Sequence, residues 1–162
     1  MSSSQPGTRT ATDGAGATAV PMRFEVTVLP VSDPDRAKAF YQRLGWRLDA
    51  DFPIDDHYRV IQFTPPGSPA SIQFGTGMTT LAPGSMHDMM LIVDDLDAAR
   101  EELSSHGAQV TEAWHGRGVG GSGRLPGPDP DGSSYRSFAA FEDPDGNRWL
   151  LQQITDRLPG RV

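Results

Sequence analysis

Cysteine is absent from this chain of 162 residues. Disulfide bonds, thiolate metal ligands and a catalytic cysteine are therefore excluded. Residues 1–20 also lack the basic-then-apolar order of a secretory signal. We therefore expect the protein to be cytoplasmic.

Basic residues and long apolar runs are scarce as well. The 14 lysine and arginine residues face 21 aspartate and glutamate residues, which gives a net charge of -7. Nucleic-acid binding usually needs a basic face, so we expect no nucleic-acid partner. No apolar run approaches the ~20 residues that span a bilayer, so we expect no membrane segment.

Glycine and small polar residues dominate the first part of the chain, MSSSQPGTRTATDGAGATAV. This composition has no apolar periodicity and indicates disorder. We expect a disordered leader over residues 1–21, a single domain over 22–158 and a tail over 159–162.

A strand, a helix and three more strands are predicted in the first half of the domain. RFEVTVLPV is strand-like, and Ser32 or Asp33 can cap the following helix, which Gly45 ends. The later strand candidates are WRLDADF, YRVIQFT and ASIQFG.

The same pattern returns 62 residues later without a gap, since Val31, Asp33 and Gly45 correspond to Val93, Asp95 and Gly107. The second copy continues with the strand candidates QVTEAWH, SYRSFAAFE and RWLLQQIT. We therefore predict an α+β fold of tandem βαβββ modules, about 22–80 and 86–158, whose curled mixed sheets form a cup. The Gly- and Pro-rich loop 116–133 is long enough to be a lid or a mobile segment.

Three segments together resemble the vicinal oxygen chelate superfamily: VSDPDRAKAFYQRLGW, VDDLDAAREELSSHG and DPDGNRWLL. This superfamily includes glyoxalase I, fosfomycin and bleomycin resistance proteins and extradiol dioxygenases. The resemblance covers residues 22–158 and implies a small-molecule ligand or substrate and a homodimer. We interpret Asp143, Asp145 and Asn147 as residues of a tight turn rather than as metal ligands.

The resemblance also implies where a divalent metal would bind. The superfamily's enzymes take one ligand from the first strand and one from the last strand of each module. Counted from the helix caps and the turn, these places hold Val26, Ser71 (or Ile72), Asp88 and Leu150. Aliphatic side chains cannot coordinate a cation, so we expect no metal and no other cofactor.

Other polar residues lie close to these places. If the strands run straight, Gln73 and Gln152 share the inward-facing parity. His115 lies beside the long loop. The expected cavity residues are Val26, Val28, Gln73, Asp88, Leu150, Gln152 and His115. A displaced metal site would use His87, Asp88, Gln73 and Gln152, if a divalent metal binds at all.

Three functions follow, and the sequence does not decide whether the protein is an enzyme. The first is metal-independent binding in the cup, similar to sequestration by bleomycin resistance proteins. The second is a metal-free enzyme in which Asp88 or Glu25 acts as a general base. The third is a metalloenzyme resembling glyoxalases and other isomerases, thiol transferases or dioxygenases. We rank them in this order.

Overall fold

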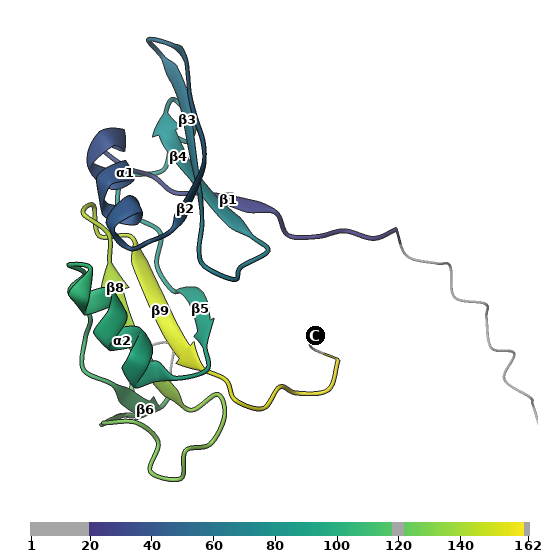
Figure 1. Cartoon of the computed structure of the whole chain (residues 1–162), viewed down its shortest axis with the longest axis vertical. Coiled ribbons are helices and arrows are strands. Elements are labelled where there is room, and N and C mark those ends of the chain that lie inside the picture. The colour runs from purple at the N-terminus through teal and green to yellow at the C-terminus, as the bar shows by residue number, and fades with distance from the viewer. Residues whose placement is uncertain (1–19, 118–121, 161–162) are drawn as a thin grey trace, which may run out of the picture.

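The computed structural model describes residues 20–117 and 122–160, so most of the expected leader lies outside the described residues. Module 1 contains β1 (Val26–Val28), α1 (Pro34–Arg43), β2 (Arg47–Asp55), β3 (Tyr58–Thr64) and β4 (Ser71–Thr76). Module 2 contains β5 (Met89–Val93), α2 (Leu96–Ser105), β6 (Trp114–Gly116), β7 (Arg124–Pro126), β8 (Ser137–Glu142) and β9 (Arg148–Gln153). Figure 1 shows the two modules one above the other along the long axis.

Each module forms one mixed sheet. Sheet A has the strand order β1-β4-β3-β2, and sheet B has the order β5-β9-β8-β6-β7. In both sheets the first strand pairs in parallel with the last one, β1 with β4 and β5 with β9, whereas the other pairs are antiparallel. The predicted tandem βαβββ architecture is confirmed, with β7 as an addition at the edge of sheet B.

The helices begin and end where the sequence predicts. Asp33 is the N-cap of α1, and its carboxylate accepts hydrogen bonds from the backbone N–H groups of Asp35 and Arg36. Asp95 is the N-cap of α2, and its carboxylate accepts the backbone N–H of Ala98. Gly45 follows α1 with a φ of 79°, a conformation that glycine adopts without strain.

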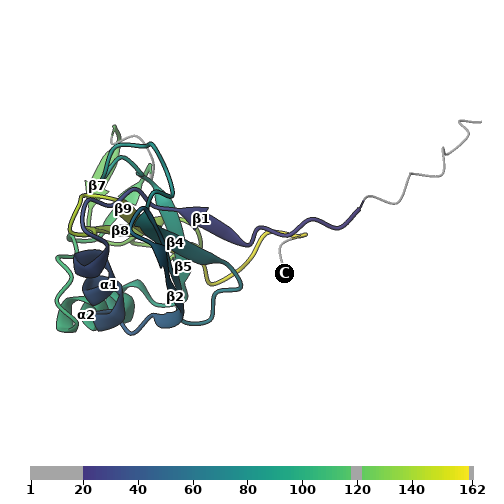
Figure 2. The ribbon, with the colours of Figure 1, turned by 90° about the horizontal axis from the view of Figure 1, so that it is seen from above.

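The main core lies between the helices and one face of each sheet. Figures 1 and 2 show α1 and α2 on the same side of the molecule. Ile61, Phe63, Ile72 and Phe74 of sheet A, and Ala139, Phe141, Trp149 and Leu151 of sheet B, are buried in this core. We call the opposite face of each sheet its open face.

Three strands differ clearly from the prediction, and the first is β1, which covers only Val26–Val28 of the expected strand segment 23–31. β6 is shorter than the expected strand 109–115: at Thr111 the backbone N–H still donates to the Ala140 carbonyl, but the Ala140 N–H donates to the Thr111 hydroxyl instead of to a backbone carbonyl. β7 lies inside the segment 116–133 that was expected to be a loop, and it pairs with β6. The role of this segment as a lid remains a prediction, since residues 118–121 lie outside the described part of the chain.

An ion-pair network connects α1 with sheet A. The Asp51 carboxylate accepts hydrogen bonds from Lys38 Nζ at 2.8 Å and from Arg59 Nε at 2.9 Å. Arg59 also contacts Asp35 at 2.9 Å. Arg59 first, and Lys38 second, hold the pKa of Asp51 far below its usual value. This carboxylate therefore remains ionised in the folded state at mildly acidic pH.

We expect Asp51→Asn to reduce the loss of stability in acid. Because its folded pKa is depressed, Asp51 contributes stability above its unfolded pKa, and this contribution is lost as the pH falls through and below ~4. Urea unfolding between pH 6 and pH 2 should show a flatter acid limb for the variant. Asp56→Asn, at an exposed position, is the control. Parallel curves for Asp51→Asn and the wild type would contradict the prediction.

Candidate functional site

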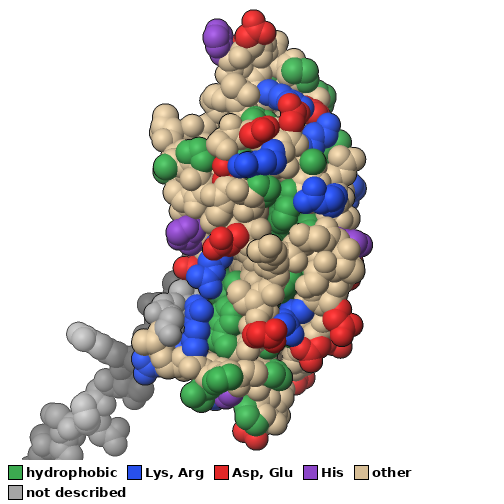
Figure 3. All heavy atoms as spheres, turned by 90° about the vertical axis from the view of Figure 1, so that its left-hand side faces the viewer, with side chains coloured by type: hydrophobic (Ala, Val, Ile, Leu, Met, Phe, Trp, Pro, Cys, Tyr) green, Lys and Arg blue, Asp and Glu red, His purple; other side chains and the backbone are tan. Residues whose placement is uncertain are grey.

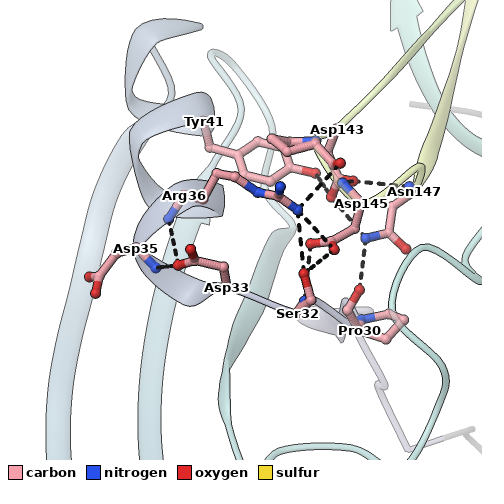
Figure 4. Close-up of polar contacts among 10 residues, drawn as sticks. Pro30, Ser32, Asp33, Asp35, Arg36, Tyr41, Asp143, Asp145 and Asn147 are labelled. Atoms are coloured by element: carbon pink, nitrogen blue, oxygen red, sulfur yellow. Dashed lines mark hydrogen bonds and ion pairs between the residues drawn. The ribbon is translucent and has the colours of Figure 1, made fainter.

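The turn between β8 and β9 holds a buried carboxylate (Figure 4). Asp143 accepts hydrogen bonds from the Tyr41 hydroxyl at 3.0 Å and from the Asn147 side-chain amide at 2.8 Å. It also accepts the backbone N–H groups of Asp145 and Asn147. Burial, reinforced by the charge of Asp143, raises the pKa of the Tyr41 hydroxyl well above its usual value.

The same turn attaches module 2 to module 1. The Asp145 carboxylate accepts hydrogen bonds from the backbone N–H and the hydroxyl of Ser32, and it pairs with Arg36 at 3.2 Å. Asn147 donates to the Pro30 carbonyl at 2.9 Å. Figure 4 shows these residues meeting where β1 leads into α1. The described polar contacts of these turn residues are therefore structural.

The open face of sheet A carries a polar network. Strand pairing places Val26 beside Ser71, Val28 beside Gln73, and Gln73 beside Gln62. The Gln73 side-chain amide donates to the Gln62 carbonyl at 2.8 Å. The wall formed by this sheet thus combines two valines with amide and hydroxyl groups.

Asp49 anchors one end of this network. Its carboxylate accepts hydrogen bonds from the Thr64 hydroxyl and from Arg47 Nε, and Thr64 in turn lies 2.7 Å from the Ser71 hydroxyl. Thr64 first, and Arg47 second, lower the pKa of Asp49. Sequence reasoning missed Asp49, Gln62 and Thr64. Strand parity could have found Gln62 and Thr64, whereas a bulge between Leu48 and Ala50 obscures the register at Asp49.

On the open face of sheet B, neighbouring side chains bury Leu150. Leu150 is 0% exposed and lies in a small cluster with Trp114, Phe138 and Ala140. The Trp114 and Phe138 rings stack with centroids 6.0 Å apart, and the Arg124 guanidinium lies 4.2 Å from the centroid of the Trp114 ring. The place that the resemblance assigns to a metal ligand is therefore part of a second hydrophobic cluster.

Met90, rather than Asp88, lies beside Leu150. Met90 pairs with Leu150, and Ile92 pairs with Gln152. Asp88 precedes β5 and has a φ of 60°, outside the extended conformation. The Gln152 side-chain amide donates to the Tyr135 carbonyl at 3.0 Å. Sequence reasoning missed Met90 and Ile92, although the period-2 pattern of the strand was a usable signal.

The remaining candidates are dispersed. Glu25 is exposed at the start of β1, where its backbone carbonyl accepts from the Ser71 N–H. His87 is exposed and lies with Nε2 3.1 Å from the Gly84 carbonyl. His115 pairs with Ser137, in the row next to Trp114 and Phe138, so its side chain is on the face opposite to Leu150. Its Nδ1 lies 2.8 Å from the Gly127 carbonyl.

The residues at the expected metal positions do not fit a divalent ion. Val26 and Leu150 have no donor atom, and Met90 offers only a thioether where sheet B brings its first and last strands together. Among residues 20–117 and 122–160, no three histidine, aspartate or glutamate side chains are grouped as metal ligands would be. The same part of the chain contains no helix long and apolar enough to cross a bilayer.

Comparison with known proteins identifies relatives of this fold. A comparison with curated protein sequences found no match. A structure described as TnmS3, an antibiotic binding protein from Streptomyces sp. CB03234, is 31% identical with a TM-score of 0.63, and the match covers 84% of this chain and 98% of that one. A glyoxalase/bleomycin resistance protein from the same strain is also 31% identical, with a TM-score of 0.59 and coverage of 81% and 100%.

A third structure, from Sphaerobacter thermophilus DSM 20745, belongs to the same superfamily and is 25% identical, with a TM-score of 0.61 and coverage of 82% and 98%. The family model described as Glyoxalase/Bleomycin resistance protein/Dioxygenase superfamily matches residues 23–151. The chain therefore belongs to the glyoxalase/bleomycin resistance protein/dioxygenase superfamily.

Proposed function

We propose that the protein binds a small molecule without a metal and sequesters it in a cup built from the open sheet faces. The observation that carries this proposal is the burial of Leu150, which is 0% exposed in a cluster with Trp114 and Phe138, at the position that the resemblance assigns to a metal ligand. Val26, in the corresponding region of sheet A, has no donor atom either. We therefore propose that the open faces bind the small molecule through side-chain contacts alone, without a metal ion.

The similar structures support the ligand class. TnmS3 is described as an antibiotic binding protein, and it matches 84% of the present chain. The open face of sheet A offers amide and hydroxyl groups beside apolar side chains, and the open face of sheet B is mainly apolar, so together they suit a ligand of antibiotic type with both polar and apolar parts. We therefore propose an antibiotic-like molecule as the ligand.

We further propose that a second copy completes the cup. The two sheets of one chain lie next to each other along the long axis (Figure 1). Both helices lie on the side of the sheets opposite to the open faces (Figure 1). Exposed apolar residues occur on the open face of sheet A, at Phe52 and Tyr58. On the helix side, by contrast, Figure 3 shows charged side chains of both signs spread over the surface. The open side is thus the better interface for a homodimer.

The enzyme alternatives have less support. Asp88 and Glu25, the two candidate bases, are both exposed, whereas a general base tuned to neutral pH is usually buried. A displaced metal would need to recruit Gln73 from sheet A together with Gln152 from sheet B. Among the described contacts, none brings these side chains together.

Elemental analysis and a thermal-shift screen of the purified protein test the proposal. We expect substoichiometric Zn, Ni, Fe and Mn, and a Tm that EDTA leaves unchanged. A bound antibiotic at 100 times its Kd stabilises the protein by about 2.7 kcal/mol, which raises Tm by roughly 5–10 °C. Near-stoichiometric metal, or a Tm that rises with metal alone, would overturn the proposal. Light scattering should give the mass of two chains.

A further inference from the structure

We propose that the ligand contacts of module 2 form a strip of Met90, Ile92, Gln152 and Arg124, and that this strip takes a flat, uncharged, largely apolar molecule. This inference rests on the proposed binding function and specifies which residues perform it. It differs from the expectation from the sequence, which placed Leu150 among the residues that line the cavity.

Strand pairing puts three members of the strip together. Met90 pairs with Leu150 in one row across the open face, and Ile92 pairs with Gln152 in the next row. Leu150 is buried, whereas Met90 is 44% and Ile92 is 39% exposed. A molecule approaching this part of the face therefore touches Met90 and Ile92 rather than the buried Leu150.

The exposed residues of β5 suit an apolar ligand of variable shape. Methionine is flexible and polarisable, and it is common on surfaces that adapt to different apolar partners. Isoleucine beside it adds a rigid branched contact. Exposed side chains of this kind lose unfavourable hydration when a ligand covers them.

Arg124 contributes a flat surface. Its guanidinium lies over Trp114, which itself stacks on Phe138, so the three planar groups form layers. Phe138 and Trp114 are buried, whereas Arg124 is half-buried and so retains some contact with solvent. A guanidinium plane stacks on aromatic rings, so an aromatic ligand can extend the stack by one layer.

Charge limits the ligand further. Two neighbouring open-face rows of sheet B include the β5 members of the strip, and they contain Trp114, Phe138, Gln152 and Ile92, and Ala140, Leu150 and Met90. None of the residues in these two rows is acidic, and Glu142 in the next row lies in register with the basic Arg148. A cationic ligand would therefore meet Arg124 without a carboxylate from these rows, and an uncharged ring system is the better match.

Titration with Nile red, an uncharged planar dye, tests the strip. We expect saturable binding to the wild type, and a loss of at least tenfold in affinity for Met90→Lys, which places a charge on an exposed position. Leu125→Lys is the matched control, since Leu125 is an apolar residue of sheet B that is 54% exposed and pairs with His115 on the opposite face. Its affinity should stay within twofold of the wild type.

Arg124→Lys separates stacking from charge, because lysine keeps the charge and loses the plane. We expect affinity to fall about threefold. Circular dichroism and light scattering should show that all three variants keep the fold and the oligomeric state of the wild type.

Equal affinities for Met90→Lys and Leu125→Lys, or no saturable dye binding by the wild type, would overturn the inference. A ligand from the thermal-shift screen that binds Met90→Lys as well as the wild type would do the same while leaving the proposed function intact. Stoichiometric metal in the purified protein would instead reject the proposed function itself.

Discussion

Replacing Asp143 by alanine should lower the free energy of unfolding by about 3 kcal/mol, because it leaves several buried donors without an acceptor. Tyr41 loses the partner of its hydroxyl, and Asn147 loses one of its side-chain acceptors. Asn147 also holds Pro30, so we expect the contact between the modules to weaken as well. The variant should still fold, with a Tm lower by roughly 10 °C.

Urea unfolding followed by fluorescence measures this effect, and Trp149, which donates to the Tyr41 hydroxyl, reports on the same region. Asp56→Ala, at an exposed position, is the control and should change stability by less than about 0.5 kcal/mol. A comparable small change for Asp143→Ala would show that the turn does not stabilise the attachment of the modules.

Leu150→Glu, which places a carboxylate at the position that the resemblance assigns to a metal ligand, should destabilise the protein rather than create a metal site. The side chain is fully buried against Trp114 and Phe138. A charged group without a partner in such a place costs more than about 3 kcal/mol. We expect little folded protein, and no recovery of stability on addition of Zn or Mn.

Gln152→Glu is the matched control, two residues further along β9 on the same face and only half-buried. It should change stability by less than about 1 kcal/mol. If Leu150→Glu yields no folded protein, Leu150→Ala gives the burial directly, with an expected loss of about 2–5 kcal/mol. A folded Leu150→Glu variant that binds metal tightly would contradict the second hydrophobic cluster and the proposed function together.

The fold could be predicted because its signals are local and repeated. Asp33 and Asp95 cap their helices, and Gly45 and Gly107 follow the helix ends with positive φ angles. A cap and a stop at the same offset identify the duplication without any knowledge of tertiary contacts. β7 was missed because a three-residue strand among glycines and prolines has little periodicity.

The metal-ligand positions were only partly predictable. Counting seven residues back from Asp95 assumes that the strand already runs at Asp88, but Asp88 has a left-handed φ and β5 begins at Met89. Parity placed Gln73 and Gln152 on the open faces, as the strand pairing shows. Counting back from the helix cap gives the wrong position at a strand end, whereas the alternation of side chains correctly predicts the face inside a strand.

The burial of Leu150 on the open face of sheet B could not be predicted from the sequence. Leu150 is buried by Trp114, whose strand is separated from β9 in the sequence and lies two strands away in the sheet. The expected inward position of His115 depends on the register of the same short strand, and one residue decides the face. Such contacts depend on strand register and side-chain volume, which no local pattern encodes.

The turn before the last strand of each module has a different structural role in the two modules. The turn of module 2 carries Asp143, Asp145 and Asn147 and holds both halves of the molecule. In module 1, the described side-chain hydrogen bonds of the corresponding turn remain inside it, between Ser68 and Ala70. We therefore expect substitutions in the first turn to affect only that turn, whereas substitutions in the second should also weaken the contact between the modules.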